Sequence, residues 1–163
     1  MFKVFLFGLL LALAPVALNF ATRRAYRTPP ASGSAIVISG ASTGIGYDAA
    51  VQLADDFVVY AGVRKEKDAD ALRALGKPTL VPVLLDVAKQ ASVDEAYEKI
   101  TADAAERGIP IWAIVNNAGI MTGSTVENHD VAKMQEIYEV NVWGVLRLTQ
   151  KFLPLIRAQS GRI

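Results

Sequence analysis

Cysteine is absent from all 163 residues of the chain. This absence excludes disulfide bonds, metal sites with cysteine ligands and catalysis by a thiol nucleophile. Histidine is almost absent as well, because His129 is the single one. Without a second histidine beside it, His129 makes no convincing metal ligand set, so the sequence predicts no metal site.

An excess of charge of either sign is also missing, since 17 Lys and Arg residues face 16 Asp and Glu residues. Beyond residue 35 the chain has 13 basic and 16 acidic residues, which argues against a nucleic-acid-binding surface. The hydrophobic fraction of 52% and the mean hydropathy of +0.29 exclude a disordered chain. The length suits one domain with a buried core.

A run of uncharged, mostly apolar residues occupies positions 4–22. As a helix rising about 1.5 Å per residue, this run would nearly span a bilayer core of about 30 Å. Arg23, Arg24 and Arg27 follow it and outweigh Lys3 before it. The positive-inside rule therefore predicts that the remaining chain lies on the cytoplasmic side.

We accordingly expect residues 1–27 to form a single-pass membrane anchor of the endoplasmic reticulum type. Because the first acidic residue of the chain is Asp48, a leader for organelle import remains an alternative, as does a cleaved secretory signal peptide. Residues 28–34, with the sequence TPPASGS, are typical of a linker.

Beyond the linker, short β-branched runs alternate with helical stretches, which is the pattern of βαβ units around a parallel sheet. The strands are expected at Ala35–Ser39, Phe57–Gly62, Thr79–Leu84 and Ile111–Val115. The helices are expected at Gly46–Ala54, Lys67–Leu75, Val93–Arg107 and Val131–Leu153. Ser92 and Glu95 have the spacing of a capping box, which predicts the start of the third helix.

A glycine-rich run, Ser39-Gly40-Ala41-Ser42-Thr43-Gly44-Ile45-Gly46, joins the first strand to the first helix. Gly40 permits a tight turn, Gly44 lets backbone amides approach a ligand, and Gly46 allows the helix to pack closely. The unpaired N–H groups of the helix N-terminus would then hold the phosphates of a dinucleotide. An ordinary glycine-rich turn is the alternative.

Asn116-Asn117-Ala118-Gly119 follows the fourth strand, at the edge where open α/β sheets bind their ligands. Asn side chains can pair exposed backbone groups there, and Gly119 permits close approach to a sugar. The alternative is a plain turn with two asparagines. The two motifs together point more strongly to a dinucleotide than either does alone.

With these motifs, the chain resembles the short-chain dehydrogenase/reductase family over about residues 35–163. Further motifs carry the resemblance, namely Asp86-Val87, Val140-Asn141-Val142-Trp143-Gly144 and Gly161-Arg162-Ile163. It implies a doubly wound parallel sheet of the Rossmann type, in which Asp86 holds the adenine amine and Asn141 joins a catalytic proton relay. A turn aspartate and a surface asparagine on a helix are the structural alternatives. The leader and the Leu153-Pro154-Leu155-Ile156-Arg157 segment are similar to the membrane-anchored retinol and hydroxysteroid dehydrogenases.

The resemblance defines a set of cofactor-binding residues, which comprises Gly40, Ser42, Thr43, Gly44, Ile45, Gly46, Arg64, Asp86, Val87, Asn117, Ala118 and Gly119. Arg64 follows the second strand, where a carboxylate would favour NAD and a guanidinium can hold the 2′-phosphate of NADP. This favours NADP, whereas Thr43 occupies a position that is often basic in the NADP enzymes of the family, so NAD stays open. The alternative for Arg64 is a solvated charge.

The family implies catalysis by a Ser and a Tyr-x-x-x-Lys motif, which would follow a strand beginning at about Arg162. None of the five tyrosines has a lysine four residues later. We therefore expect residues 35–163 to be the N-terminal, C-terminally truncated part of a Rossmann domain, inactive by itself. The whole enzyme would interconvert an alcohol and a carbonyl on a small or lipophilic substrate. A noncatalytic membrane protein that binds a dinucleotide or a partner is the alternative.

Apolar residues lie on several faces of the expected 131–153 helix. Such a helix needs cover from further chain or from another subunit. The sequence therefore leaves open a homo-oligomer formed through this helix.

Overall fold

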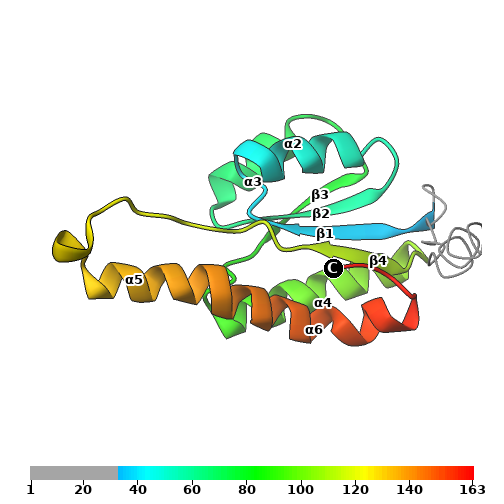
Figure 1. Cartoon of the computed structure of the whole chain (residues 1–163). Helices are drawn as coiled ribbons and strands as arrows, with labels where there is room; N and C mark the ends of the chain where they lie inside the picture. The colour runs from blue at the N-terminus through cyan, green and yellow to red at the C-terminus, as the bar shows by residue number, and fades with distance from the viewer. Residues whose placement is uncertain (1–32) are drawn as a thin grey trace, which may run out of the picture.

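The computed structural model describes residues 33–163, which are drawn in colour in Figure 1. The expected anchor at 1–27 and most of the linker lie outside these residues, so both remain predictions. Within the described part, no helix combines the length and apolar character needed to cross a bilayer.

Four parallel strands form one sheet in the order β3-β2-β1-β4. The strands are β1 (Ala35–Ser39), β2 (Val58–Val63), β3 (Leu80–Leu84) and β4 (Ile111–Val115). The predicted strands are confirmed, two of them with identical bounds and two shifted by one residue at one or both ends. All of β1 is buried because it has strands on both sides and helices on both faces. Strands β2 and β3 lie on one side of β1, whereas β4 lies on the other side. This change in strand order places a crevice at the carboxyl ends of β1 and β4.

Helices cover both faces of the sheet (Figure 1). One face carries α2 (Gly44–Leu53) and α3 (Glu66–Arg73), and the other carries α4 (Gln90–Glu106) and α6 (Val145–Ala158). Each layer has its own apolar core, with Leu72 buried in the first and Phe152 in the second. The predicted doubly wound α/β class is thus confirmed for the described residues.

The predicted capping box is wrong. Helix α4 begins at Gln90, with Lys89 as its N-cap, so Ser92 already lies inside the first turn. Its hydroxyl accepts a hydrogen bond from the backbone N–H of Asp86 at 2.9 Å. Ser92 therefore fixes the turn that follows β3, a contact that spacing within the helix could not indicate.

The single helix predicted at 131–153 has a more complex form. It consists of α5 (Val131–Tyr138), a π-helical turn η3 (Glu139–Gly144) and α6, which continues past Pro154 to Ala158. Proline removes one backbone N–H, yet Phe152 and Ile156 on either side of it are buried in the core and hold the helix in place. Val131, Tyr138 and Trp143 are exposed, so the predicted need for cover applies to this surface, and the oligomer remains a prediction.

Tyr60 of β2 is fully buried, and its hydroxyl donates to Asp103 Oδ2 of α4 at 2.8 Å. Burial raises the pKa of Tyr60, and the hydrogen bond to Asp103 raises it further. Arg107 donates to the same oxygen at 2.7 Å. The tyrosine therefore ties the sheet to α4.

We expect Tyr60→Phe to lower the free energy of unfolding by about 1 kcal/mol, because a buried hydrogen bond is lost. The difference should hold at neutral pH and shrink above about pH 10, where the unfolded chain ionises its tyrosine first and the wild type loses this stabilisation. Chemical denaturation of the wild type and Tyr60→Phe at several pH values measures this difference in the free energy of unfolding. Equal stability of the two at pH 7 would contradict the assigned contact.

Candidate active site at the carboxyl edge of the sheet

Close packing of the turn from β1 into α2 depends on glycine at two positions. Gly40 has a φ of +70°, and a Cβ there would lie 2.7 Å from the Cα of Ala118. At Gly46, a Cβ would collide with the side-chain amide of Asn117 and with the carbonyl of Gly40. Only residues without a side chain let the start of α2 approach the end of β4 so closely.

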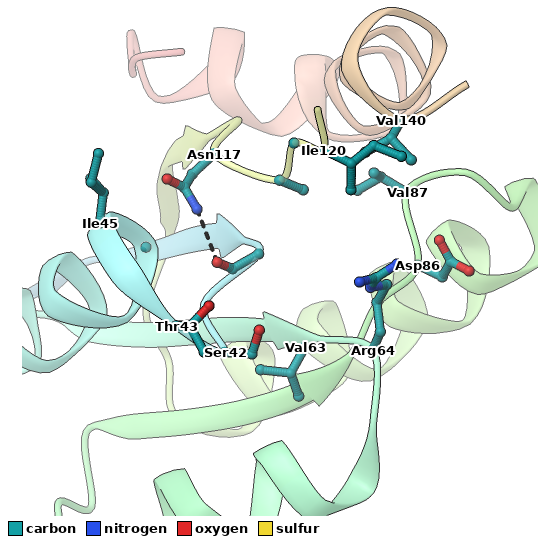
Figure 2. Close-up of a pocket in the computed structure, with 14 residues that line it drawn as sticks. Ser42, Thr43, Ile45, Val63, Arg64, Asp86, Val87, Asn117, Ile120 and Val140 are labelled. Atoms are coloured by element: carbon teal, nitrogen blue, oxygen red, sulfur yellow. Dashed lines mark hydrogen bonds between the residues drawn. The ribbon is translucent and has the colours of Figure 1, made fainter. Parts of the chain in front are cut away.

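The loop after β4 is bonded to this turn by Asn117. Its side-chain amide donates to the carbonyls of Ser39 at 3.0 Å and Gly40 at 2.9 Å, the second of which is drawn in Figure 2. Asn116 faces the other way, donating to Thr149 Oγ1 of α6 at 3.1 Å. The two asparagines thus have different tasks, and only Asn117 joins the two sequence motifs.

Ser39 strengthens the same junction and was missed as a site residue by the sequence analysis. Its side chain is almost fully buried, and its hydroxyl accepts from the N–H groups of Asn117 and Ala118, both at 3.1 Å. The hydroxyl also donates to the carbonyl of Val115 at 3.3 Å. The available signal was a lone polar residue at the end of an otherwise apolar strand.

A cavity of about 290 Å³ opens between these loops (Figure 2). It is lined by every residue of the predicted cofactor-binding set except Gly44. Val63, Ile120 and Val140 also line it, and sequence reasoning did not include them. Its lining combines apolar side chains with polar groups from several loops, as sites for cofactors do.

The first turn of α2 forms one side of the cavity. Thr43, Gly44 and Ile45 are exposed, and Ile45 shows 83% of its surface. Gly44 has a φ of +60°, and a Cβ there would meet no atom of residues 33–163 within 4 Å. Glycine is therefore favoured at residue 44 by its positive φ. It also leaves open space before the helix N-terminus, where an anion is favoured.

Asp86 and Arg64 line the far end of the cavity. Asp86 Oδ1 accepts from the N–H of Ala88 at 3.2 Å, and its Oδ2 lies 3.5 Å from Lys89 Nζ. The predicted alternative of a turn aspartate thus describes part of its role, alongside its place in the cavity wall. Arg64 follows directly on β2, and Figure 2 shows its guanidinium on the cavity side, near Asp86.

Asn141 does not line the cavity and lies in the π-turn η3. Its side-chain oxygen accepts from the N–H of Ile120 at 2.9 Å, and its amide donates to the carbonyl of Ile120 at 2.8 Å. Ile120 itself lines the cavity, next to Gly119. The asparagine side chain therefore holds the cavity wall by a pair of backbone hydrogen bonds.

Comparison with known proteins finds relatives among curated dehydrogenases. The chain is 37% identical to the mitochondrial D-beta-hydroxybutyrate dehydrogenase of Bos taurus over 86% of its own length and 43% of the relative's. It is 32% identical to the 17-beta-hydroxysteroid dehydrogenase type 2 of Homo sapiens, over 82% of this chain and 35% of the relative. The chain thus spans less than half the length of these curated relatives.

Solved structures show the same fold. An NADPH-bound carbonyl reductase from chicken fatty liver superposes with a TM-score of 0.67 and 32% identity, covering 75% of this chain and 50% of the other. A 3-ketoacyl-(acyl-carrier-protein) reductase of Brucella melitensis complexed with NADH gives 0.69 and 28%, covering 78% and 51%. The sequence profile of the family described as short chain dehydrogenase matches residues 34–163. The chain therefore belongs to the short chain dehydrogenase family, as its motifs predicted.

Proposed function

We propose that this chain is the dinucleotide-binding part of an NAD(P)-dependent oxidoreductase that interconverts an alcohol and a carbonyl. The single observation that carries the proposal is the cavity formed where the Gly40–Gly46 turn meets the Asn117–Gly119 loop. Two glycines of the turn support it, because a Cβ at Gly46 would collide with Asn117 and Gly40 and one at Gly44 would project into open space.

Three groups of residues would hold the cofactor. The N–H groups from Ser42 to Gly46 would bind the pyrophosphate at the helix N-terminus, where the dipole favours negative charge. Asp86 and Val87 would contact the adenine. Asn117, Ala118 and Gly119 would line the path of a ribose. When bound, the nicotinamide would supply or accept a hydride.

Arg64 would select NADP over NAD. It lies at the cavity end that holds Asp86, and a guanidinium can bind a 2′-phosphate with two parallel hydrogen bonds. The relatives include an NADPH-bound carbonyl reductase and an NADH-bound reductase, which supports both nucleotides as candidates. The position of Arg64 favours NADP.

Catalytic turnover would need a Tyr-x-x-x-Lys pair that this sequence lacks, because no tyrosine has a lysine four residues later. The Asn141 side chain is paired with the backbone of Ile120, and its part in a proton relay stays a proposal from the family resemblance. The substrate would be a small or lipophilic alcohol or carbonyl compound. A noncatalytic dinucleotide-binding or partner-binding membrane protein is the second candidate, favoured by the same missing motif.

Calorimetric measurement of NADPH binding to the full chain tests the proposal. We expect Gly46→Ala to weaken NADPH binding at least about tenfold, since the new methyl group displaces Asn117 or Gly40 and distorts the cavity. Gly123→Ala is the matched control, because a Cβ at Gly123 meets open space among the described residues. A folded wild type that binds neither NADPH nor NADH would refute the proposed function.

Exchange of the charge at residue 64 tests cofactor selection. We expect Arg64→Asp to weaken NADPH binding by about tenfold to a hundredfold, because a carboxylate repels the 2′-phosphate. The affinity for NADH should stay equal or improve. Lys67→Asp, at a neighbouring exposed position, makes the same charge change away from the cavity and should alter neither affinity. Unchanged NADPH affinity in Arg64→Asp would remove Arg64 from the proposed site.

We expect the 163-residue chain to oxidise no alcohol with either nicotinamide nucleotide, because it has no Tyr-x-x-x-Lys motif. Absorbance of the reduced nicotinamide measures this directly. Turnover that copurifies with the chain and disappears in Asn141→Ala would contradict the expectation.

A further inference from the structure

An ion pair spans the π-turn that contains Asn141. Arg147 Nη2 lies 2.7 Å from Glu139 Oε2, and Arg147 Nη1 donates to the backbone carbonyl of Glu139 at 3.3 Å. The guanidinium thus contacts the first residue of η3 from the first turn of α6.

The spacing of this pair depends on the π-turn. Residues eight apart on a regular α-helix are rotated by about 80° from each other, since each residue turns by about 100°. A π-turn inserts about one extra residue, so the pair behaves like residues seven apart, on one face and about two turns apart. An extended arginine and an extended glutamate can meet across that distance. The ion pair therefore matches the π-turn and would be strained by a regular helix.

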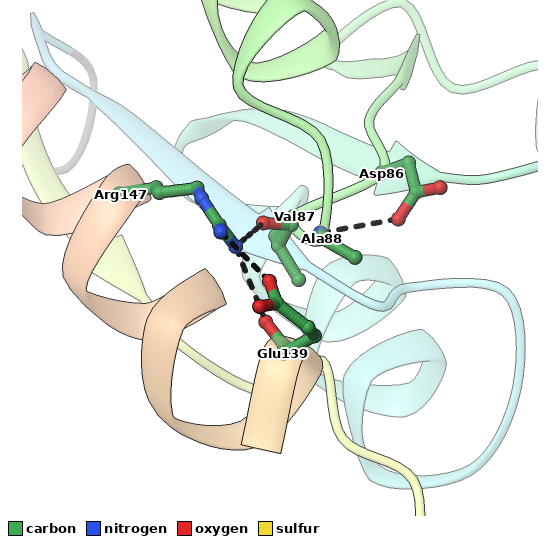
Figure 3. Close-up of polar contacts among 5 residues, drawn as sticks. All are labelled: Asp86, Val87, Ala88, Glu139 and Arg147. Carbon is green, nitrogen blue, oxygen red and sulfur yellow. Dashed lines mark hydrogen bonds and ion pairs between the residues drawn. The ribbon is translucent and has the colours of Figure 1, made fainter. Parts of the chain in front are cut away.

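The same guanidinium reaches the loop after β3. Arg147 Nη1 lies 3.5 Å from the carbonyl of Val87, a long hydrogen bond that Figure 3 shows beside the ion pair. Close packing supports it, because a Cβ at Gly144 would lie 2.7 Å from Val87 Cγ2. Helix and loop are therefore in contact both through backbone packing and through the arginine.

This contact is better protected than an exposed salt bridge. The Arg147 side chain is 25% exposed and that of Glu139 is 47% exposed. Fully exposed pairs contribute about 0–1 kcal/mol. Arg147 is instead held by one carboxylate oxygen and two backbone carbonyls from two segments, a pattern that the planar fork of arginine fits and a lysine ammonium does not.

Both segments held by Arg147 reach the cavity. Val87 lines it beside Asp86, and η3 reaches it through Val140 and through the bond of Asn141 to Ile120. We propose that Arg147 is a positioning residue that locks the Asp86–Val87 loop and the π-turn of Asn141 into one unit, so that the ADP-ribose half of the cofactor meets a preformed wall. This inference rests on the proposed function, since it assigns Asp86 and Val87 to the adenine.

Binding of ADP-ribose tests the inference without any catalytic step. Calorimetry on the full chain should show about tenfold weaker ADP-ribose binding in Arg147→Met, and a smaller loss in Arg147→Lys, which keeps the charge but not the fork. Arg157→Met is the matched control, because it removes an exposed arginine from the last turn of the same helix, and it should bind like the wild type.

Thermal melting of each variant separates positioning from simple stability. If Arg147→Met binds ADP-ribose within about twofold of a wild type that binds it, the inference is wrong, whatever the melting temperature. If Arg147→Met does not fold, Glu139→Gln and Arg147→Lys replace it, and wild-type affinity in both would overturn the inference. A wild type that binds no ADP-ribose, NADPH or NADH refutes the proposed function and this inference together.

Hydrogen exchange provides a readout independent of the nucleotide. In Arg147→Met, amides of segments 84–90 and 139–146 should both exchange faster than in the wild type, because one residue holds both, whereas Arg157→Met should change neither. Faster exchange confined to 139–146 would show that Arg147 only stabilises its own helix and would overturn the coupling.

Discussion

The site depends on one close contact between two loops that are almost eighty residues apart in the sequence. The Asn117 side chain donates to the carbonyls of Ser39 and Gly40. It can do so only because Gly46 has no Cβ, which would collide with the Asn117 amide. Ser39 completes the junction by accepting two N–H groups from the other loop. Once joined, the loops enclose a cavity whose walls also receive Arg64 and Asp86 from the neighbouring strands.

Strand order explains why the junction forms at this edge. In a parallel sheet the carboxyl ends of all strands lie together, and the crevice falls between β1 and its outer neighbour β4. The start of α2 therefore faces the loop after β4. On the other face, Arg147 joins the loop after β3 to the π-turn, and Asn141 of that turn bonds Ile120 in the loop after β4. The loops after β1, β3 and β4 are thus linked through these contacts.

Much of this arrangement could be predicted from the sequence, because β-branched runs and glycine spacing are local signals. The strands at 35–39 and 111–115 have the predicted bounds, and nearly all of the predicted cofactor-binding residues gather at one cavity. The misses came from contacts and backbone detail that residue spacing does not encode. Ser92 has the spacing of a cap, but its hydroxyl bonds Asp86, and the π-turn at 139–144 breaks a helix whose apolar pattern looks continuous. Ser39 had one local signal, a polar residue at the end of an apolar strand, but its role depends on partners in the other loop.

Exchange of one atom at the junction tests the account most directly. Asn117→Asp keeps the side chain's shape but replaces the donating amide by an oxygen that repels the carbonyls of Ser39 and Gly40. Asn116→Asp makes the same change at the adjacent residue, whose side chain faces Thr149. The account predicts that NADPH affinity, measured by calorimetry, falls at least about tenfold in the first variant and changes little in the second. Equal affinity for the wild type and Asn117→Asp would contradict it.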